Sequence, residues 1–209
     1  MNFKNKKILI TAGPTWVPID SVRVISNIAS GQTGILLARE ALRRGAKVTL
    51  FLGPVSICCL PGRMRLVRFT FFRELMDKIR KELRNIRYDL IIHSAAVSDF
   101  KPKRKAGSKL SSAKGLRLEL KPLPKIIDCI KRYAGGHKTV IFKLEPGVSE
   151  TTLISRAKLA RDKYNAEIVV ANQPDPYRAF IIDKQDTIKK VGSKEGLAKG
   201  LFEALGKRK

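Results

Sequence analysis

The chain has 209 residues, which is long enough for the hydrophobic core of one α/β domain. Its 43 Lys and Arg residues against 18 Asp and Glu residues give a formal net charge of +25. A charge of this size indicates an anionic partner or a strongly anionic milieu. No stretch approaches about 18 consecutive apolar residues, and the opening MNFKNKK lacks the apolar region of a signal peptide. These patterns exclude a membrane span and favour a cytoplasmic protein.

The first predicted elements are a buried strand and a helix joined by a loop of small and polar residues. The apolar run Ile8–Ile10 is typical of a parallel strand buried on both faces. The loop ends at Gly31–Gly34, after which Ile35, Ala38 and Leu42 fall on one helical face. Backbone N–H groups at such a helix start carry a positive dipole end and can hold a phosphate or a carboxylate. This segment therefore predicts an anion- or nucleotide-binding α/β protein.

Strand and helix patterns alternate through the rest of the chain. Further strands are predicted at 47–52, 64–69, 89–93, 139–143 and 167–171, and further helices at 71–85, 126–133, 150–164 and 193–205. Segments 179–183 and 187–191 predict a β-hairpin at a sheet edge. We expect one domain over residues 1–209, with a Rossmann-like, doubly wound, mostly parallel sheet and a small edge hairpin.

A basic stretch, SDFKPKRKAGSKLSSAK at 98–114, interrupts this alternation with six Lys or Arg residues and few apolar ones. Its composition predicts a mobile loop. One interpretation is a solvated surface loop. The other is a flap that closes over phosphates, because the stretch follows the carboxyl end of a strand, where open α/β sheets place their ligands.

Several short motifs together resemble the phosphopantothenate–cysteine ligase family. They follow the order and about the spacing of that family from near residue 5 to near residue 205: ITAGPT and PID at 10–20, VRVISNIASGQTG at 22–34, HSAAVSDF at 93–100, FKLE at 142–145 and IVVAN at 168–172. The resemblance implies a dimeric Rossmann-like enzyme that joins 4′-phosphopantothenate to L-cysteine through an acyl-nucleotide intermediate. CTP or ATP would be the cosubstrate and Mg²⁺ the metal. Because the chain begins at the ligase strand, we expect no flavin domain and a separate flavin-dependent decarboxylase.

The resemblance also implies the site residues. Asn27, Lys109 and Arg23 are the expected catalytic residues: the amide would hold the acyl carbonyl and the two cations would hold phosphates. Arg23 would lie beside Asn27 if the stretch between them coils. The implied nucleotide-binding residues are Ser94, Ala95, Ala96, Asp99, Lys109, Phe142 and Lys163. The implied substrate-binding residues are Gly13, Asn27, Ser30 and Gly31, and the implied metal ligand is Asp99.

Other interpretations of these residues stay open at this point. Lys109 can be a solvated lysine, Asn27 a turn former and Phe142 a core residue. The sequence has no GxGxxG after the first strand and no acidic residue at the end of the second, which disfavours a nicotinamide-dependent dehydrogenase. The alternatives that remain are a basic nucleic-acid-binding protein without catalytic activity, favoured by the net charge, and a degenerate ligase that binds nucleotide only.

Overall fold

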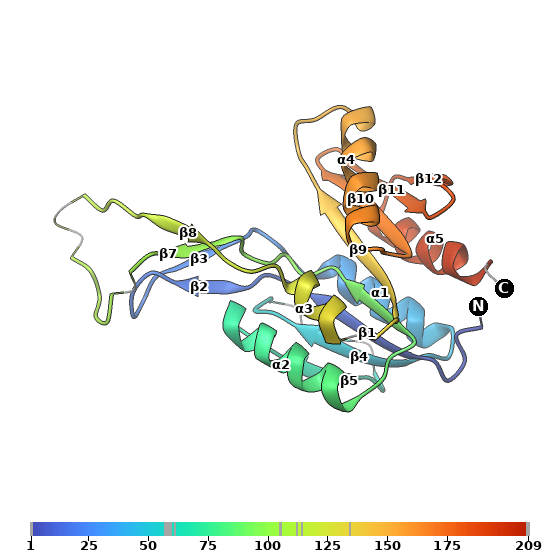
Figure 1. Ribbon diagram of the computed structural model, residues 1–209, viewed down its shortest axis with the longest axis horizontal. Helices are drawn as coiled ribbons and strands as arrows, with labels where there is room; N and C mark the ends of the chain where they lie inside the picture. Colours follow the sequence, from blue (N-terminus) through green and yellow to red (C-terminus); the bar gives the residue numbers. More distant parts are fainter. Residues whose placement is uncertain are drawn as a thin grey trace.

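A computed structural model (Figure 1) describes residues 2–56, 60, 62–104, 106–111, 113, 115–133 and 135–207. Its centre is an eight-stranded sheet with the strand order β12-β11-β10-β9-β6-β1-β4-β5. The strands are β1 (Lys7–Ala12), β4 (Lys47–Leu52), β5 (Arg65–Arg68), β6 (Leu90–His93), β9 (Lys138–Leu144), β10 (Ile168–Pro174), β11 (Tyr177–Asp183) and β12 (Ile188–Val191). The pairs from β5 across to β10 are parallel, and β11 and β12 join in antiparallel fashion. The predicted doubly wound, mostly parallel sheet with an edge hairpin is confirmed.

In the described part of the chain, five helices cover the two faces of the sheet. They are α1 (Gln32–Arg43), α2 (Phe72–Asn85), α3 (Ile126–Tyr133), α4 (Glu150–Lys163) and α5 (Lys194–Gly206). One hydrophobic core packs α1 and α5 against one face, and a second packs α2, α3 and α4 against the other. Two cores, one on each face, explain why the central strands are apolar on both sides. None of the described helices has both the length and the apolar character needed to cross a bilayer.

Local signals place the ends of these helices close to the predicted bounds. Ser149 and Ser193 cap α4 and α5, because their Oγ atoms accept from the N–H groups of Thr152 at 3.1 Å and Gly196 at 3.0 Å. Gly45 follows α1 with a φ of 80°, a left-handed conformation that ends a helix readily when the residue is glycine. Helix propensity and capping therefore agree with the tertiary fold at these positions.

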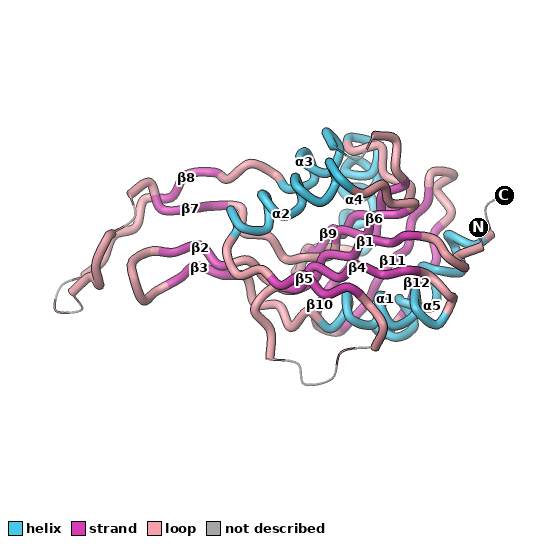
Figure 2. Tube along the Cα trace, turned by 90° about the horizontal axis from the view of Figure 1, so that it is seen from below, coloured by secondary structure: helices cyan, strands magenta, loops and turns pink. Residues whose placement is uncertain are grey.

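Two short hairpins, which we call the arm, extend from the carboxyl side of the sheet (Figure 2). The first pairs β2 (Trp16–Pro18) with β3 (Val24–Ser26), and the second pairs β7 (Phe100–Pro102) with β8 (Leu120–Pro122). The basic stretch 98–114 was predicted as a loop throughout, but its beginning is strand β7. The prediction failed there because three-residue strands rich in Lys and Pro carry no periodic apolar signal.

Candidate functional site

A cavity of about 1030 Å³ opens at the carboxyl ends of the central strands. It lies where β1 has β4 on one side and β6 on the other. The crossover connections diverge at this point of the sheet, which is its topological switch point. Open α/β sheets bind their ligands at such a point. All but two of the predicted site residues line the cavity: Gly13, Asn27, Ser30, Gly31, Ser94, Ala95, Ala96, Asp99, Phe142 and Lys163.

Glycines shape the β1–α1 wall of this cavity. Gly13 and Gly31 have φ values of 80° and 72°, which few other residues adopt without strain. A Cβ atom on Gly34 would lie 2.3 Å from the Cβ atom of Ala12, so α1 can approach β1 closely only with glycine there. The N-cap residue Gly31 has no side chain to cap α1, Ser30 Oγ accepts from the Gln32 N–H at a long 3.4 Å, and the first turn of α1 holds no acidic residue. The N-terminus of α1 is therefore suited to an anion in the cavity.

The ends of β1 and β6 are locked together by polar contacts. Thr11 Oγ1 and His93 Nδ1 are hydrogen-bonded at 2.8 Å, and Ser94 Oγ donates to the Thr11 carbonyl oxygen at 2.7 Å. Burial lowers the pKa of His93 to about 4, so its imidazole is neutral at physiological pH. His93 lines the cavity, a position that the sequence analysis did not single out. The small side chains of Ala95 and Ala96 leave room for a ligand against the backbone.

Asn27 and Asp99 lie in the cavity wall after β3 and after β6. Asn27 Nδ2 donates to the Val97 carbonyl oxygen at 3.0 Å, which fixes the orientation of the amide. Asp99 is exposed and accepts from Lys125 Nζ at 2.5 Å. No group of three or more His, Cys, Asp or Glu side chains suited to a metal occurs in the described part of the chain. Asp99 is not part of such a group, and its role as a metal ligand stays a prediction.

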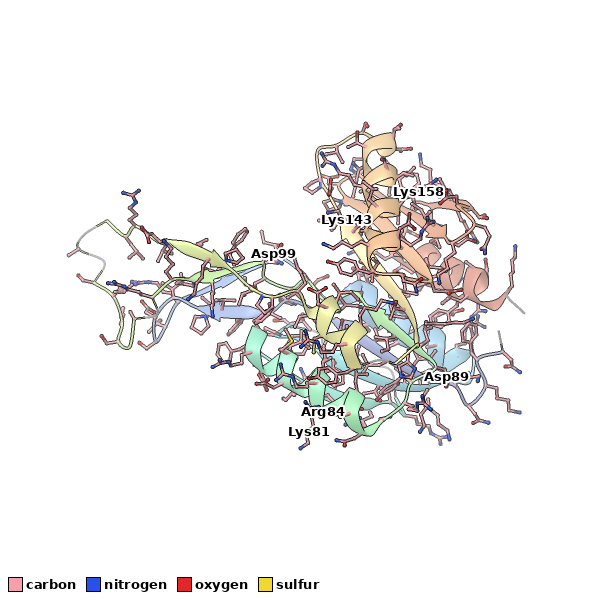
Figure 3. All side chains as sticks on the ribbon, in the orientation of Figure 1. Lys81, Arg84, Asp89, Asp99, Lys143 and Lys158 are labelled. Carbon is pink, nitrogen blue, oxygen red and sulfur yellow. The ribbon has the colours of Figure 1, made fainter. Side chains whose placement is uncertain are left out.

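Four lysines line the cavity: Lys125, Lys143, Lys163 and Lys194. Among the described lining residues Asp99 is the single carboxylate, so the cavity is strongly positive. Figure 3 labels Lys143 on β9 and Asp99 where the arm joins the sheet. Lys143 pairs with Glu145 at 2.8 Å, and Lys194 Nζ donates to Gln32 Oε1 at 2.8 Å beside the start of α1. Such a charge balance suits a ligand with several negative charges.

Two further polar residues of the cavity wall were missed or left open by the sequence analysis. Asn172 is the last residue of the IVVAN motif and lies within β10, a position for which a structural role was left open, and Tyr177 begins β11 without any sequence signal. Both line the cavity, and both have a buried side-chain oxygen without a hydrogen-bond partner in the described structure. Buried polar atoms are nearly always paired, so these oxygens indicate contacts that a ligand can complete.

Arg23 and Lys109 do not line the cavity, because both lie in the arm. The stretch between Arg23 and Asn27 does not coil. It forms the extended strand β3, so the four residues span roughly 13 Å and Arg23 does not lie beside Asn27. The Arg23 guanidinium instead donates to Asp20 Oδ2 at 3.0 Å and to the Leu110 carbonyl oxygen at 3.2 Å. Lys109 is exposed. The catalytic roles of both cations stay predictions.

Buried Asp20, the last residue of the PID motif, holds this part of the arm together. Its carboxylate accepts from the N–H groups of Val22 at 2.8 Å, Arg23 at 2.7 Å and Leu110 at 3.1 Å. These backbone hydrogen bonds lower the pKa of Asp20 to about 2. The basic stretch is thus tied to the β2–β3 turn.

The fold and the cavity define an α/β protein of the Rossmann-like class with a lysine-lined cavity at its switch point. Residues 3–205 match the family model described as the DNA/pantothenate metabolism flavoprotein C-terminal domain. The chain belongs to this family.

Individual proteins agree with this assignment. The chain is 36% identical over 212 residues to the coenzyme A biosynthesis bifunctional protein CoaBC of Thermococcus kodakarensis, covering 99% of this chain and 52% of that protein. It thus spans about half the length of the curated relatives it matches. The crystal structure of the DNA/pantothenate metabolism flavoprotein from Streptococcus pneumoniae is similar with a TM-score of 0.85 and 27% identity, over 96% of this chain and 98% of that one. The C-terminal domain of a CoaBC protein gives a TM-score of 0.81 and 25% identity, over 98% and 96% of the two chains.

Proposed function

We propose that this chain is a cytoplasmic ligase of coenzyme A biosynthesis, joining 4′-phosphopantothenate and L-cysteine. The observation that carries the proposal is the lysine-rich cavity at the switch point, which gathers ten of the residues implied by the ligase motifs. The family and the name of the Thermococcus kodakarensis relative support the same pathway.

The proposed reaction has two steps. A carboxylate oxygen of phosphopantothenate attacks the α-phosphorus of CTP or ATP, and the bond to the β-phosphate breaks to release pyrophosphate. The cysteine amine then attacks the acyl carbon, loses a proton and expels the nucleoside monophosphate. Both steps bring several negative charges together, and fixed positive groups are needed to stabilise them.

The described residues supply such groups. The N-terminus of α1, together with Lys143 and Lys163, would hold phosphates. The side-chain amide of Asn27, whose orientation is fixed by its hydrogen bond to the Val97 carbonyl oxygen, would orient the acyl group. Mg²⁺ would be held by the phosphates and Asp99, and it would offset charge on the transferred nucleotide. Lys109 and Arg23 would act from the arm, and a homodimer is expected.

Pyrophosphate release tests the proposal. The assay contains phosphopantothenate, cysteine and Mg²⁺, and compares CTP with ATP. We expect release that depends on phosphopantothenate, with a preference for one nucleotide, and a loss of about 10²-fold or more in Asn27→Asp and in Lys109→Gln.

Lys199→Gln is the matched control, because Lys199 is exposed on α5 away from the cavity. Its activity should equal that of the unmodified chain. If no nucleoside triphosphate gives pyrophosphate from folded protein, the ligase proposal fails. Salt-dependent binding to nucleic acid would then be the next measurement.

A further inference from the structure

A second groove, which we call the α2–α3 groove, lies between the arm and the helices α2 and α3 (Figure 1). Its volume is about 950 Å³. It shares Pro124 and Lys125 with the switch-point cavity, and its other lining residues are different. The proposed ligase reaction gives none of those other residues a role.

The groove combines an apolar floor with two exposed aromatic side chains. The floor consists of side chains from the core under α2 and α3: Val17, Phe72, Met76 and Cys129. Trp16 and Phe71 also line the groove, yet they retain 36% and 41% of their accessible surface. They are neighbours, because the two residues form a β-bridge and the Trp16 N–H donates to the Thr70 carbonyl oxygen at 2.9 Å. Two adjacent aromatic faces are thus available for stacking.

The charge of the groove is strongly positive. Among the described residues, seven Lys or Arg side chains line it against three carboxylates. Two of these carboxylates are already paired, Asp77 with Arg80 at 3.2 Å and Glu74 with Lys78 at 2.5 Å. Four of the lining cations form no ion pair with a described residue: Arg73 on α2, Arg132 on α3, Lys101 on β7 and Lys121 on β8. Cations therefore face the groove from the helices and from the arm.

The two lysines of the arm are arranged unfavourably in the free protein. Lys101 and Lys121 lie directly opposite each other in the antiparallel pair β7–β8. Like charges at directly opposed positions destabilise a strand pair. A bound anion would offset this repulsion, so the arrangement itself indicates a negatively charged ligand.

The shape and charge of the groove distinguish between possible ligands. A second copy of the chain, bound through the same surface, would bring the same unpaired cations together. A flat bilayer cannot reach the floor of a groove. Single-stranded nucleic acid fits both features, because its phosphates pair with cations and its unpaired bases stack on exposed aromatic side chains. A duplex keeps its base faces covered.

We propose that the α2–α3 groove binds single-stranded nucleic acid. The bases stack on Trp16 and Phe71, and the phosphates pair with the cations of the helices and of the arm. This inference does not rest on the proposed ligase function. It assigns a ligand to part of the +25 net charge, which the four lysines of the switch-point cavity leave largely unexplained.

The fluorescence of Trp16 tests the proposal directly, because Trp16 is the single tryptophan of the chain. The full chain is titrated, without ligase substrates, with oligouridylate or oligothymidylate of about 12 nucleotides and with a duplex of equal length. Both single strands should quench Trp16 and bind more tightly than the duplex. Comparing the two single strands shows whether the ribose 2′-hydroxyl contributes.

Variants locate the binding surface. Arg73→Gln, Lys121→Gln and Arg132→Gln should each reduce the slope of log K against log salt by roughly 0.7. Lys199→Gln on α5 is the charge control and should leave the slope unchanged. Phe71→Ala should weaken binding about tenfold. Phe100→Ala is the aromatic control, because Phe100 is exposed on β7 but does not line the groove.

Three results would overturn the proposal. The first is binding without a change in Trp16 emission. The second is an equal loss of affinity in the groove variants and in the two controls, which would mean that the net charge alone attracts nucleic acid. The third is equal quenching by polyglutamate, which would mean that the groove binds an acidic protein instead. Pyrophosphate release is measured separately, so failure of the ligase proposal would leave this result unaffected.

Discussion

The switch-point cavity and the arm adjoin each other, yet different interactions hold them. The cavity wall rests on buried parallel strands and on close backbone packing, such as that of Gly34 against Ala12. The arm rests on short hairpins and on polar contacts, with the Asp20 carboxylate at their centre. Several large apolar side chains of the arm are exposed, and Phe100 retains 50% of its accessible surface. We therefore expect changes in the cavity wall to act on global stability, and changes in the arm to act locally.

The largest expected effect concerns His93 in the cavity wall. Its pKa is about 4 in the folded protein and 6.5 ordinarily, so the unfolded chain binds the proton more readily. Stability should therefore be lost as the pH falls from 6.5, by about 3 kcal/mol at pH 4 from this group. Urea unfolding at pH 7 and at pH 4 measures this loss of stability. Between these pH values the unfolding free energy of His93→Asn should fall by about 3 kcal/mol less than that of the unmodified chain. An equal fall in the two proteins would contradict the low pKa of His93.

The next effect concerns the close contact of α1 with β1. Gly34→Val would place side-chain atoms against Ala12 and the Ser94 Oγ atom, and overpacking of this kind costs about 1–3 kcal/mol. Gly107→Val is the matched control in the arm, because a Cβ atom there meets nothing within 4 Å. The control should change the unfolding free energy by less than about 0.5 kcal/mol. If Gly34→Val and Gly107→Val had similar midpoints of urea unfolding, the proposed difference between the cavity wall and the arm would be contradicted.

The smallest global effect is expected from Asp20 in the arm. Because the folded-state pKa of Asp20 is about 2 against an ordinary 3.8, its contribution is complete above about pH 4 and is lost as the pH falls through about 2. Asp20→Asn should lower the midpoint of unfolding less than Gly34→Val does, while amide exchange at Leu110 becomes several-fold faster. Asp77→Asn, which breaks an exposed pair with Arg80 on α2, is the control. Unchanged exchange at Leu110 would show that the carboxylate does not hold the arm.

The contrast between the central sheet and the arm also explains which parts of the fold the sequence predicts. The strands of the sheet were predicted within a few residues because runs such as Ile8–Ile10 are buried on both faces, and α3 was predicted at its observed bounds. In the arm the short strands β2, β3, β7 and β8 were not predicted, because strands of three residues carry no periodic apolar signal. β11 begins two residues before its predicted start, because Tyr177 already pairs with Pro174 of β10 across the turn that joins the two strands.

The site was predictable to a similar degree. Motif order indicated most of the residues that line the cavity, since they follow the strands whose carboxyl ends meet. Tyr177 was not predicted because a buried hydroxyl without a partner has no sequence signal. Asp20 was part of a quoted motif, but its role was not predicted because its three backbone donors come from two separate segments. Such properties appear only when the chain is folded.

The arrangement of the chain ends has a practical consequence. β1 begins at Lys7 and α5 ends at Gly206, and both ends lie on the side of the molecule opposite the arm (Figures 1 and 2). A tag, a surface tether or a fused domain at either end would therefore leave the cavity mouth open. Because the ends are also near each other, a short linker between them should permit circular permutation, with new ends in an exposed turn.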